Sequence, residues 1–407
     1  MILKKIIFSF LLLLISGFLH SQNIKTIQLK PLGDKQFSAI VPLGTRLELS
    51  FDDLDAGNQE YQYKIQHMTA DWQESKMLTS QYITGFAQNS IINSSNSFHT
   101  FQEYTHYSVQ IPNENLIIKK SGNYLISVLD EYDELVFSRR FTLYEKAVTI
   151  GVLVTQSRNI KTIHQQQTVQ FTIHHPTIRI NNPQQEIKVS VLQNNNWKTA
   201  ITHLKPKFFK PNQLIYNYIN QSNFNGGNEY LFFENKSLQN KSLNIYKIEN
   251  KDLFHHYVYP YTYKEYQTYK YNPDINGQFI IRTLNGSDPK TEADYVQMHF
   301  SVKVDAPFYD EDLYAYGAFN NFELNTKNKL TFDKKDNTYK ATLLLKQGFY
   351  NYTFVSKNLE NKINEGRILG DFSTTENQYT VLVYYRPFGG LYDRVVGVGT
   401  SYFAGER

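Results

Sequence analysis

The stretch Leu135-Val-Phe-Ser-Arg-Arg-Phe-Thr-Leu143 decides the fold class, because every second residue is placed on one face of a predicted strand: Leu135, Phe137, Arg139, Phe141 and Leu143. Upstream, Tyr124-Leu-Ile-Ser-Val128 has the same strand-like character. The acidic stretch Asp130-Glu-Tyr-Asp-Glu134 between the two segments suits the tip of a hairpin. The pair therefore predicts two antiparallel strands joined by a short turn.

Further strands are predicted on the N-terminal side of this hairpin, at residues 46–50, 61–67 and 107–111. Between the first two lies a polar cluster that suits a turn, made of Asp52, Asp53, Asp55, Gly57 and Asn58. Several short strands at this spacing, without a long helical period, favour an immunoglobulin-like β-sandwich over residues 22–146.

The same pattern continues to the end of the chain, which predicts an all-β protein of tandem β-sandwich domains. A middle sandwich with long loops is expected over residues 147–304, and a third over residues 305–407 after the break Asp305-Ala-Pro307. The third opens with Tyr314-Ala-Tyr-Gly-Ala-Phe-Asn-Asn-Phe322, which resembles the first strand and turn of starch-binding-like modules. Those modules often carry a sugar-contacting tryptophan where Phe322 stands, so the resemblance supports the fold more than sugar binding.

The first 21 residues have the layout of a secretory signal peptide. Lys4 and Lys5 precede an apolar run over residues 6–15, and a cleavage point is expected between Ser21 and Gln22. Without this leader, 40 Lys and Arg face 38 Asp and Glu, so the formal charge of +2 gives no indication of nucleic-acid binding. The chain has no cysteine and no later run long enough to span a bilayer, so a soluble protein stabilised by core burial alone is expected.

No pattern in the sequence indicates catalysis, a metal or a cofactor. The nucleophile elbow Gly-x-Ser-x-Gly, the phosphate-binding loop and the dinucleotide fingerprint are all absent. His174-His175 and His255-His256 are adjacent pairs, whose side chains point to opposite faces of a strand and do not readily give two ligands. The Asp52–Asp55 cluster lacks the remaining spacing of a calcium loop. We therefore expect a protein that is not an enzyme and has no small-molecule substrate.

Trp72 lies just after a predicted strand and before the irregular, polar residues 73–97. A tryptophan at this position either fills the core or anchors a protein interface, where the residue type is enriched. The first reading is favoured, and the second remains open.

Several segments together make the chain resemble the type IX secretion system plug protein family of Bacteroidota-type bacteria. They are Ile27-Gln-Leu-Lys-Pro-Leu-Gly33, Leu47-Glu-Leu-Ser-Phe-Asp-Asp-Leu-Asp55, Tyr63-Lys-Ile-Gln-His67, Ala70-Asp-Trp72, Ser80-Gln-Tyr-Ile-Thr-Gly-Phe86, Tyr104-Thr-His-Tyr107, Ser121-Gly-Asn-Tyr124, Glu376-Asn-Gln-Tyr-Thr-Val-Leu-Val-Tyr-Tyr-Arg-Pro-Phe388 and Tyr392-Asp-Arg394. The resemblance spans essentially the whole mature chain and is least distinct over residues 205–275. One departure is Met68-Thr69, where relatives often carry Cys-Asn.

The resemblance implies a periplasmic protein, peripheral to the outer membrane, whose partner is the outer-membrane translocon of the secretion system. Such a plug docks on the periplasmic opening and closes the pore when neither shuttle nor cargo occupies it. We expect Asp71, Trp72, Tyr82 and Phe86 to lie at or near the docking surface.

Two other functions are compatible with the sequence. A periplasmic glycan-binding protein would expose aromatic faces together near Phe319 and Phe322, and a hydrolase would place paired acidic side chains in a pocket. A plug predicts instead a broad docking surface.

Overall fold

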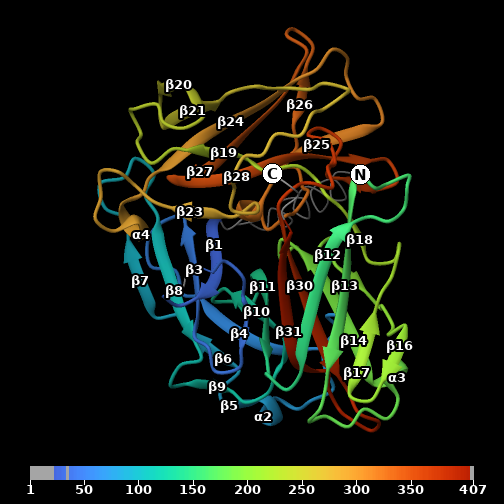
Figure 1. The fold of residues 1–407 in the computed structure, drawn as a ribbon. Helices are drawn as coiled ribbons and strands as arrows, with labels where there is room; N and C mark the ends of the chain where they lie inside the picture. The colour runs from blue at the N-terminus through green and yellow to red at the C-terminus, as the bar shows by residue number, and fades with distance from the viewer. Residues whose placement is uncertain (1–22, 34–35, 404–407) are drawn as a thin grey trace, which may run out of the picture.

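Nearly all regular structure in the chain is β-strand, arranged as three sandwiches (Figure 1). The computed structural model describes residues 23–33 and 36–403, so the expected signal peptide lies outside the described residues. The predicted all-β class with tandem β-sandwiches is confirmed.

The first sandwich packs a sheet of order β1-β3-β8-β7 against a sheet of order β2-β11-β10-β4-β6. Its strands are β1 (Ile24–Pro31), β2 (Ile40–Pro42), β3 (Leu47–Asp53), β4 (Gln62–Met68), β6 (Gln88–Ser90), β7 (Asn93–Asn96), β8 (Thr105–Ile111), β10 (Gly122–Leu129) and β11 (Leu135–Tyr144). A small extension at one end consists of α2 (Thr79–Tyr82), β5 (Ile83–Gly85) and β9 (Leu116–Ile118).

The predicted hairpin is present, since β10 and β11 pair antiparallel with Tyr124 opposite Phe141 and Val128 opposite Phe137. The prediction that Asp52 and Asp53 lie in a turn was wrong, because β3 continues to Asp53. Both carboxylates are buried, and the turn begins after them. Partners from another sandwich replace the water that a turn would have supplied to Asp52, as described below.

The second sandwich is built from two separated parts of the sequence. One sheet has the order β12-β13-β17-β16 with β18 also on β13, and the other has the order β15-β14-β30-β31. Its elements are β12 (Thr149–Gln156), β13 (Gln166–His174), α3 (Pro183–Glu186), β14 (Ile187–Gln193), β15 (Ile201–Thr202), β16 (Phe208–Lys210), β17 (Gln213–Tyr216), β18 (Asn223–Asn225), β30 (Asn377–Tyr385) and β31 (Arg394–Phe403).

The third sandwich is inserted in the second, between β18 and β30. Its long strand β28 pairs with β19, β23, β25 and β29, and the facing sheet has the order β20-β21-β24-β27-β26 with β22 also on β24. The elements are β19 (Leu231–Glu234), β20 (Ile245–Asn250), β21 (Phe254–Val258), β22 (Tyr261–Thr262), β23 (Phe279–Ile281), α4 (Pro289–Glu292), β24 (Tyr295–Lys303), β25 (Glu311–Tyr316), η1 (Ala318–Asn320), β26 (Thr331–Asp333), β27 (Thr338–Lys346), β28 (Gly348–Asn358) and β29 (Ile363–Asn364). A boundary between the middle and third sandwiches was expected at residues 304 and 305. Two sheets pair strands from before and after this point, since β24 pairs with β27 and β14 pairs with β30.

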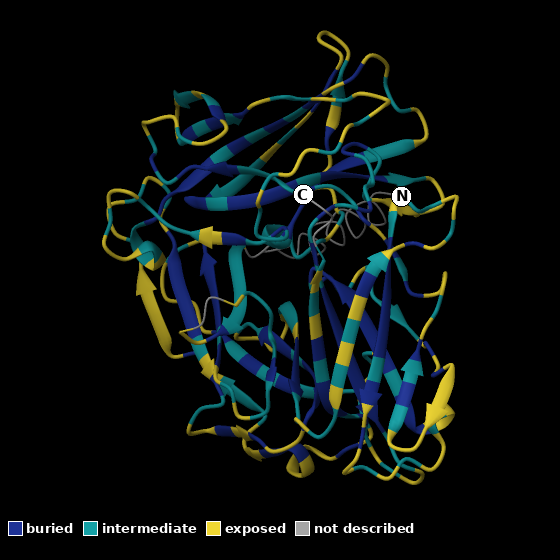
Figure 2. Ribbon diagram, in the orientation of Figure 1, coloured by how far each residue is buried: buried dark blue, intermediate teal, exposed yellow. Residues whose placement is uncertain are grey.

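Each sandwich has its own buried core (Figure 2). Aromatic rings stack in pairs within these cores. Phe171 and Tyr216 lie 4.3 Å apart between centroids in the second sandwich, and Phe233 and Tyr350 lie 5.1 Å apart in the third. Such pairs add to the burial of large rings, which explains how a chain without cysteine stabilises its domains. In Figure 1 the third sandwich lies across the top, with the first and second side by side beneath it.

Candidate docking surface and interdomain joints

Three exposed apolar side chains lie at one end of the first sandwich, on the extension formed by α2, β5 and β9. Leu78, Phe86 and Ile117 are 70, 73 and 51% exposed there. Strands β5 and β9 pair, and Gly85 makes the connection to Phe86 with a φ of 94°. A Cβ at Gly85 would lie 2.1 Å from the carbonyl oxygen of Asn115, so only glycine allows this close approach. We call these three side chains the apolar tip.

Tyr82, predicted near the docking surface, is buried in the core beneath the apolar tip. Its ring centroid lies 5.6 Å from that of His67 and 6.1 Å from that of Tyr124. Burial lowers the pKa of His67 to about 4, because the charged imidazolium would be desolvated there. Tyr82 is therefore part of the core of the first sandwich, whereas Phe86 faces solvent.

Asp71 and Trp72 lie where the first sandwich meets the second. The indole of Trp72 packs edge-on against Trp197 with centroids 4.9 Å apart, and the guanidinium of Arg140 lies 4.5 Å from the centroid of its ring. Asp71 forms a 2.6 Å ion pair with Lys188 of β14. Both residues therefore make contacts within the chain, between domains, rather than forming one patch with Phe86.

A buried carboxylate, that of Asp393, strengthens this contact between the first and second sandwiches. Asp393 is 1% exposed and accepts a 2.8 Å hydrogen bond from the backbone N–H of Ala70. It also pairs with the guanidinium of Arg386 at 2.8 Å. Around it, apolar side chains from both sandwiches form a shared cluster that includes Leu382 and Tyr384. We call this contact the Asp393 joint.

A second joint, centred on Asp52, connects the first sandwich to the third. The Asp52 carboxylate is fully buried and receives the amine of Lys346 at 2.7 Å, the hydroxyl of Tyr295 at 2.7 Å and Nδ1 of His106 at 2.6 Å. The Lys346 side chain is only 1% exposed, and desolvation lowers its pKa while the Asp52 charge opposes that shift. The amine also lies 4.0 Å from the ring centroid of Tyr104. We call this contact the Asp52 joint.

The Asp52 joint was not predicted from the sequence. The one available signal was a lysine, Lys346, at the end of the apolar run Leu343-Leu-Leu345. A charge in that position needs either solvent or a partner.

The third sandwich also contacts the second through buried polar groups. Asn196 donates a 3.0 Å hydrogen bond to the hydroxyl of Tyr316. Nearby, burial raises the pKa of Glu365 to about 7, and its Oε1 is shielded from water without a hydrogen-bond partner. Burial likewise raises the pKa of Asp274 to about 7, although its carboxylate accepts from two backbone N–H groups.

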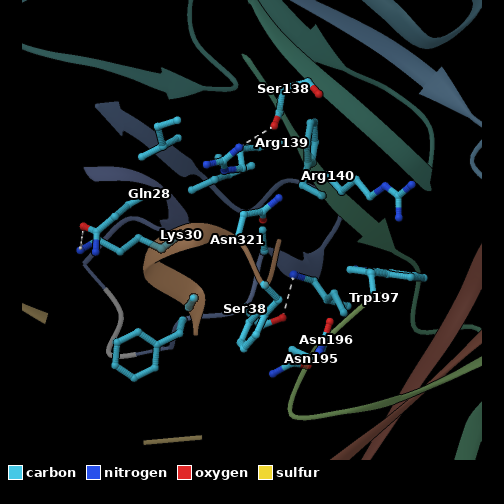
Figure 3. A pocket seen from close by; sticks show the side chains of 18 of the residues that line it. Gln28, Lys30, Ser38, Ser138, Arg139, Arg140, Asn195, Asn196, Trp197 and Asn321 are labelled. Atoms are coloured by element: carbon cyan, nitrogen blue, oxygen red, sulfur yellow. Dashed lines mark hydrogen bonds between the residues drawn. The ribbon is translucent and has the colours of Figure 1, made fainter. Parts of the chain in front are cut away.

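The three sandwiches surround a central cavity of about 440 Å³ (Figure 3). Arg139 and Arg140 line it from the first sandwich, Asn195 and Trp197 from the second, and Asn321 from the third. Burial lowers the pKa of the Arg139 guanidinium to about 10, so it stays protonated at neutral pH.

The aromatic residues named for sugar binding do not form an open platform. Phe319 is half-buried against Tyr350 at 6.1 Å, and Phe322 packs edge-on against Tyr316 at 5.2 Å. Among the residues that the structure describes, no cluster of three or more His, Asp or Glu could hold a metal ion. The adjacent histidines diverge as expected of strand residues, since His256 is buried and contacts Leu238 whereas His255 contacts His299.

Within residues 23–33 and 36–403, the structure contains no helix with the length and apolar character needed to cross a bilayer.

Comparison with known proteins identifies the family. Residues 24–145, the first sandwich, match the family model described as type 9 secretion system plug protein 1st domain. A crystal structure of a hypothetical protein from Parabacteroides merdae is 33% identical, with a TM-score of 0.89 over 93% of this chain and 97% of that one. A crystal structure of the serine-rich repeat protein Srr2 from Streptococcus agalactiae is 9% identical over 94% of this chain and 93% of that one, with a TM-score of 0.14. No curated protein matches the sequence. The chain belongs to the type 9 secretion system plug protein family and has a role associated with that secretion system.

Proposed function

We propose that this protein is a periplasmic plug, which docks on the periplasmic opening of the outer-membrane translocon and closes the pore when neither shuttle nor cargo occupies it. The observation that carries the proposal is membership of the plug family, combined with a first sandwich that is tied to each of the other two by a buried carboxylate. The proposed role is mechanical and involves no catalysis.

A plug must keep its shape against the opening that it covers, and the joints serve this requirement. Ions buried at an interface fix its geometry, because any sliding would separate a charge from its partner inside a low-dielectric environment. The Asp52 joint ties the first sandwich to the third, and the Asp393 joint ties it to the second. The three domains are thereby expected to move as one body.

The apolar tip is the part of the predicted docking region best suited to contact a partner. Monomeric proteins rarely keep neighbouring large apolar side chains exposed without a reason, and aromatic anchors dominate many interfaces. Phe86 presents its ring to solvent, whereas Tyr82 of the same extension is buried in the core. Asp71 and Trp72 would act indirectly, by fixing the orientation of the first sandwich.

The direct experiment is affinity purification of the tagged mature protein from its native envelope, with and without the shuttle component. Recovery of the giant translocon, increased when the shuttle is absent, is the expected result. A folded protein that never recovers the translocon would refute the proposal.

A matched pair of variants tests the apolar tip. Phe86→Ser is expected to reduce recovery of the translocon by about tenfold or more without changing thermal stability, since Phe86 is 73% exposed. Ile160→Ser, on the second sandwich, removes a side chain that is 89% exposed and is expected to leave recovery unchanged. Equal recovery for both variants would remove the apolar tip from the docking surface.

A further inference from the structure

One edge of β11 faces the central cavity without a neighbouring strand. Strand β2 pairs with β11 only at residues 142–144, while β10 pairs with β11 along its opposite edge. In the described part of the chain, no strand continues the pairing of β2 toward residue 138. An unpaired edge offers backbone N–H and C=O groups to any extended peptide that can reach it.

Two arginines flank this open edge. Arg139 and Arg140 are consecutive, so their side chains leave the strand on opposite faces, as Figure 3 shows. Arg139 lies on the face of Phe137 and donates to the adjacent carbonyl oxygen of Ser138 at 2.8 Å. The guanidinium of Arg140 lies over the ring of Trp72, and neither guanidinium has a carboxylate of the described residues within ion-pair distance.

The wall of the cavity carries an excess of positive charge. Its charged lining residues are Lys30, Arg139, Arg140, Lys198 and Glu323, which is four cations to one carboxylate. Lys198 and Glu323 are 46 and 47% exposed, so solvent reaches the cavity on their side. A volume of about 440 Å³ lies within the range of ligand sites, roughly 300–1,000 Å³.

The geometry points to a binding site for a short acidic peptide segment, extended along the open edge of β11 with carboxylates on the guanidinium groups of Arg139 and Arg140. Arginine binds carboxylates through two parallel hydrogen bonds, and strand addition supplies the main-chain bonds that distinguish a peptide from a free anion. Asn195 and Asn321 line the same space, where the Asn195 amide bonds to Gln378 and the Asn321 amide to Glu323. The inference is independent of pore closure, because it concerns the isolated protein.

The protein contains its own reporter for this site. Trp72 and Trp197, the two tryptophans of the chain, both line the cavity. Titration of residues 22–407 with triglutamate, followed by intrinsic fluorescence and calorimetry, is expected to show saturable binding that weakens with added salt. Trilysine should not bind. Triglutamate methylated on its backbone nitrogens should bind several-fold more weakly, because it loses donors for strand pairing.

Variants connect the signal to the cavity. Arg139→Gln is expected to weaken triglutamate binding about tenfold or more, as it removes a charge-assisted hydrogen bond. Lys198→Gln, at the half-exposed rim, should weaken it about two- to threefold and is a safe second variant if Arg139→Gln folds poorly. Arg158→Gln removes an exposed arginine outside the cavity lining and should have no effect.

Three results would overturn the inference. The first is no saturable binding of triglutamate, and the second is equal binding of trilysine. The third is a protein that binds inorganic phosphate but not triglutamate, which would indicate an anion site instead of a peptide site.

Discussion

Replacing Lys346 with methionine tests whether the Asp52 joint holds the first and third sandwiches together. Lys346→Met keeps an unbranched side chain of similar length and removes the charge. Asp52 would then lose one of its three partners and keep the hydroxyl of Tyr295 and the imidazole of His106. The carbonyl oxygen of Lys290 would also lose the 2.7 Å hydrogen bond that it accepts from the Lys346 amine.

The expected cost follows from the burial of both charges. Removing one member of a buried ion pair typically costs about 3–5 kcal/mol, because the other charge stays buried and uncompensated. Lys346 also pays a desolvation cost in the wild type, as its lowered pKa indicates, and that cost disappears in the variant. We therefore expect the lower end of the range, about 3 kcal/mol.

The loss is measured as the free energy of local opening, by amide hydrogen exchange of peptides that cover β8 and β24. Local measurement is necessary because three sandwiches need not unfold in one step. Lys362→Met is the matched control, since Lys362 pairs with Glu360 at 2.7 Å with 76 and 69% exposure. An exposed pair contributes about 0–1 kcal/mol, so exchange in this variant should stay near that of the wild type.

The double variant Asp52→Asn/Lys346→Met supplies the decisive comparison. It removes the orphaned charge, and we expect it to recover part of the protection lost in Lys346→Met. If Lys346→Met were no more damaging than Lys362→Met, or if the double variant were less stable than Lys346→Met alone, the reasoning about the Asp52 joint would be refuted.

Three further predictions concern other buried titratable groups. Burial lowers the pKa of His67 in the folded protein to about 4. The contribution of neutral His67 to folding stability is therefore complete above pH 6.5 and is lost as the pH falls toward 4, a loss on the order of 3 kcal/mol. An NMR titration of His67 with a midpoint near 6.5 would contradict this. Glu365 has its folded pKa raised to about 7, so stability is complete below about pH 4.5 and is lost as pH rises through 7. At pH 8 the free energy of unfolding of Glu365→Gln, measured by denaturant titration, should exceed that of the wild type by about 1–3 kcal/mol. At pH 4 the variant should show no such gain. Asp393→Ala should cost about 1–3 kcal/mol, because the Ala70 N–H loses its acceptor and the partly exposed Arg386 loses its partner. A loss below 1 kcal/mol would show that the Asp393 joint is dispensable.

The sequence predicted local pairings well because hairpins are encoded over short distances. Strand β11 covers the predicted residues 135–143, and β10 covers residues 124–128, with the acidic turn between them. The alternation that placed Arg139 on the face of Phe137 and Phe141 also holds, although it gave no hint that this face borders a cavity.

Long-range pairings were not predictable from the same pattern. Strands β30 and β31 return to the second sandwich after the third has been completed, and β14 pairs with β30 across about 190 residues of sequence. Periodicity reports which residues are buried, and it does not report against which partner. The partners of Asp52 and Trp72 were missed for this reason, since both side chains contact another domain.

The arrangement of the joints bears on how a plug could be released. The chain crosses between the second and third sandwiches twice, before β19 and after β29, and the first sandwich is tied to each by a buried carboxylate. These contacts close a ring, so separating the first sandwich from either of the others would expose a buried carboxylate and strain the remaining contacts as well. A translocon that changes state can displace its plug only through differential affinity for the surface that it touches. Release is therefore expected to depend on the exposed docking surface, where no buried ion pair has to be broken, and to leave the three-sandwich body intact.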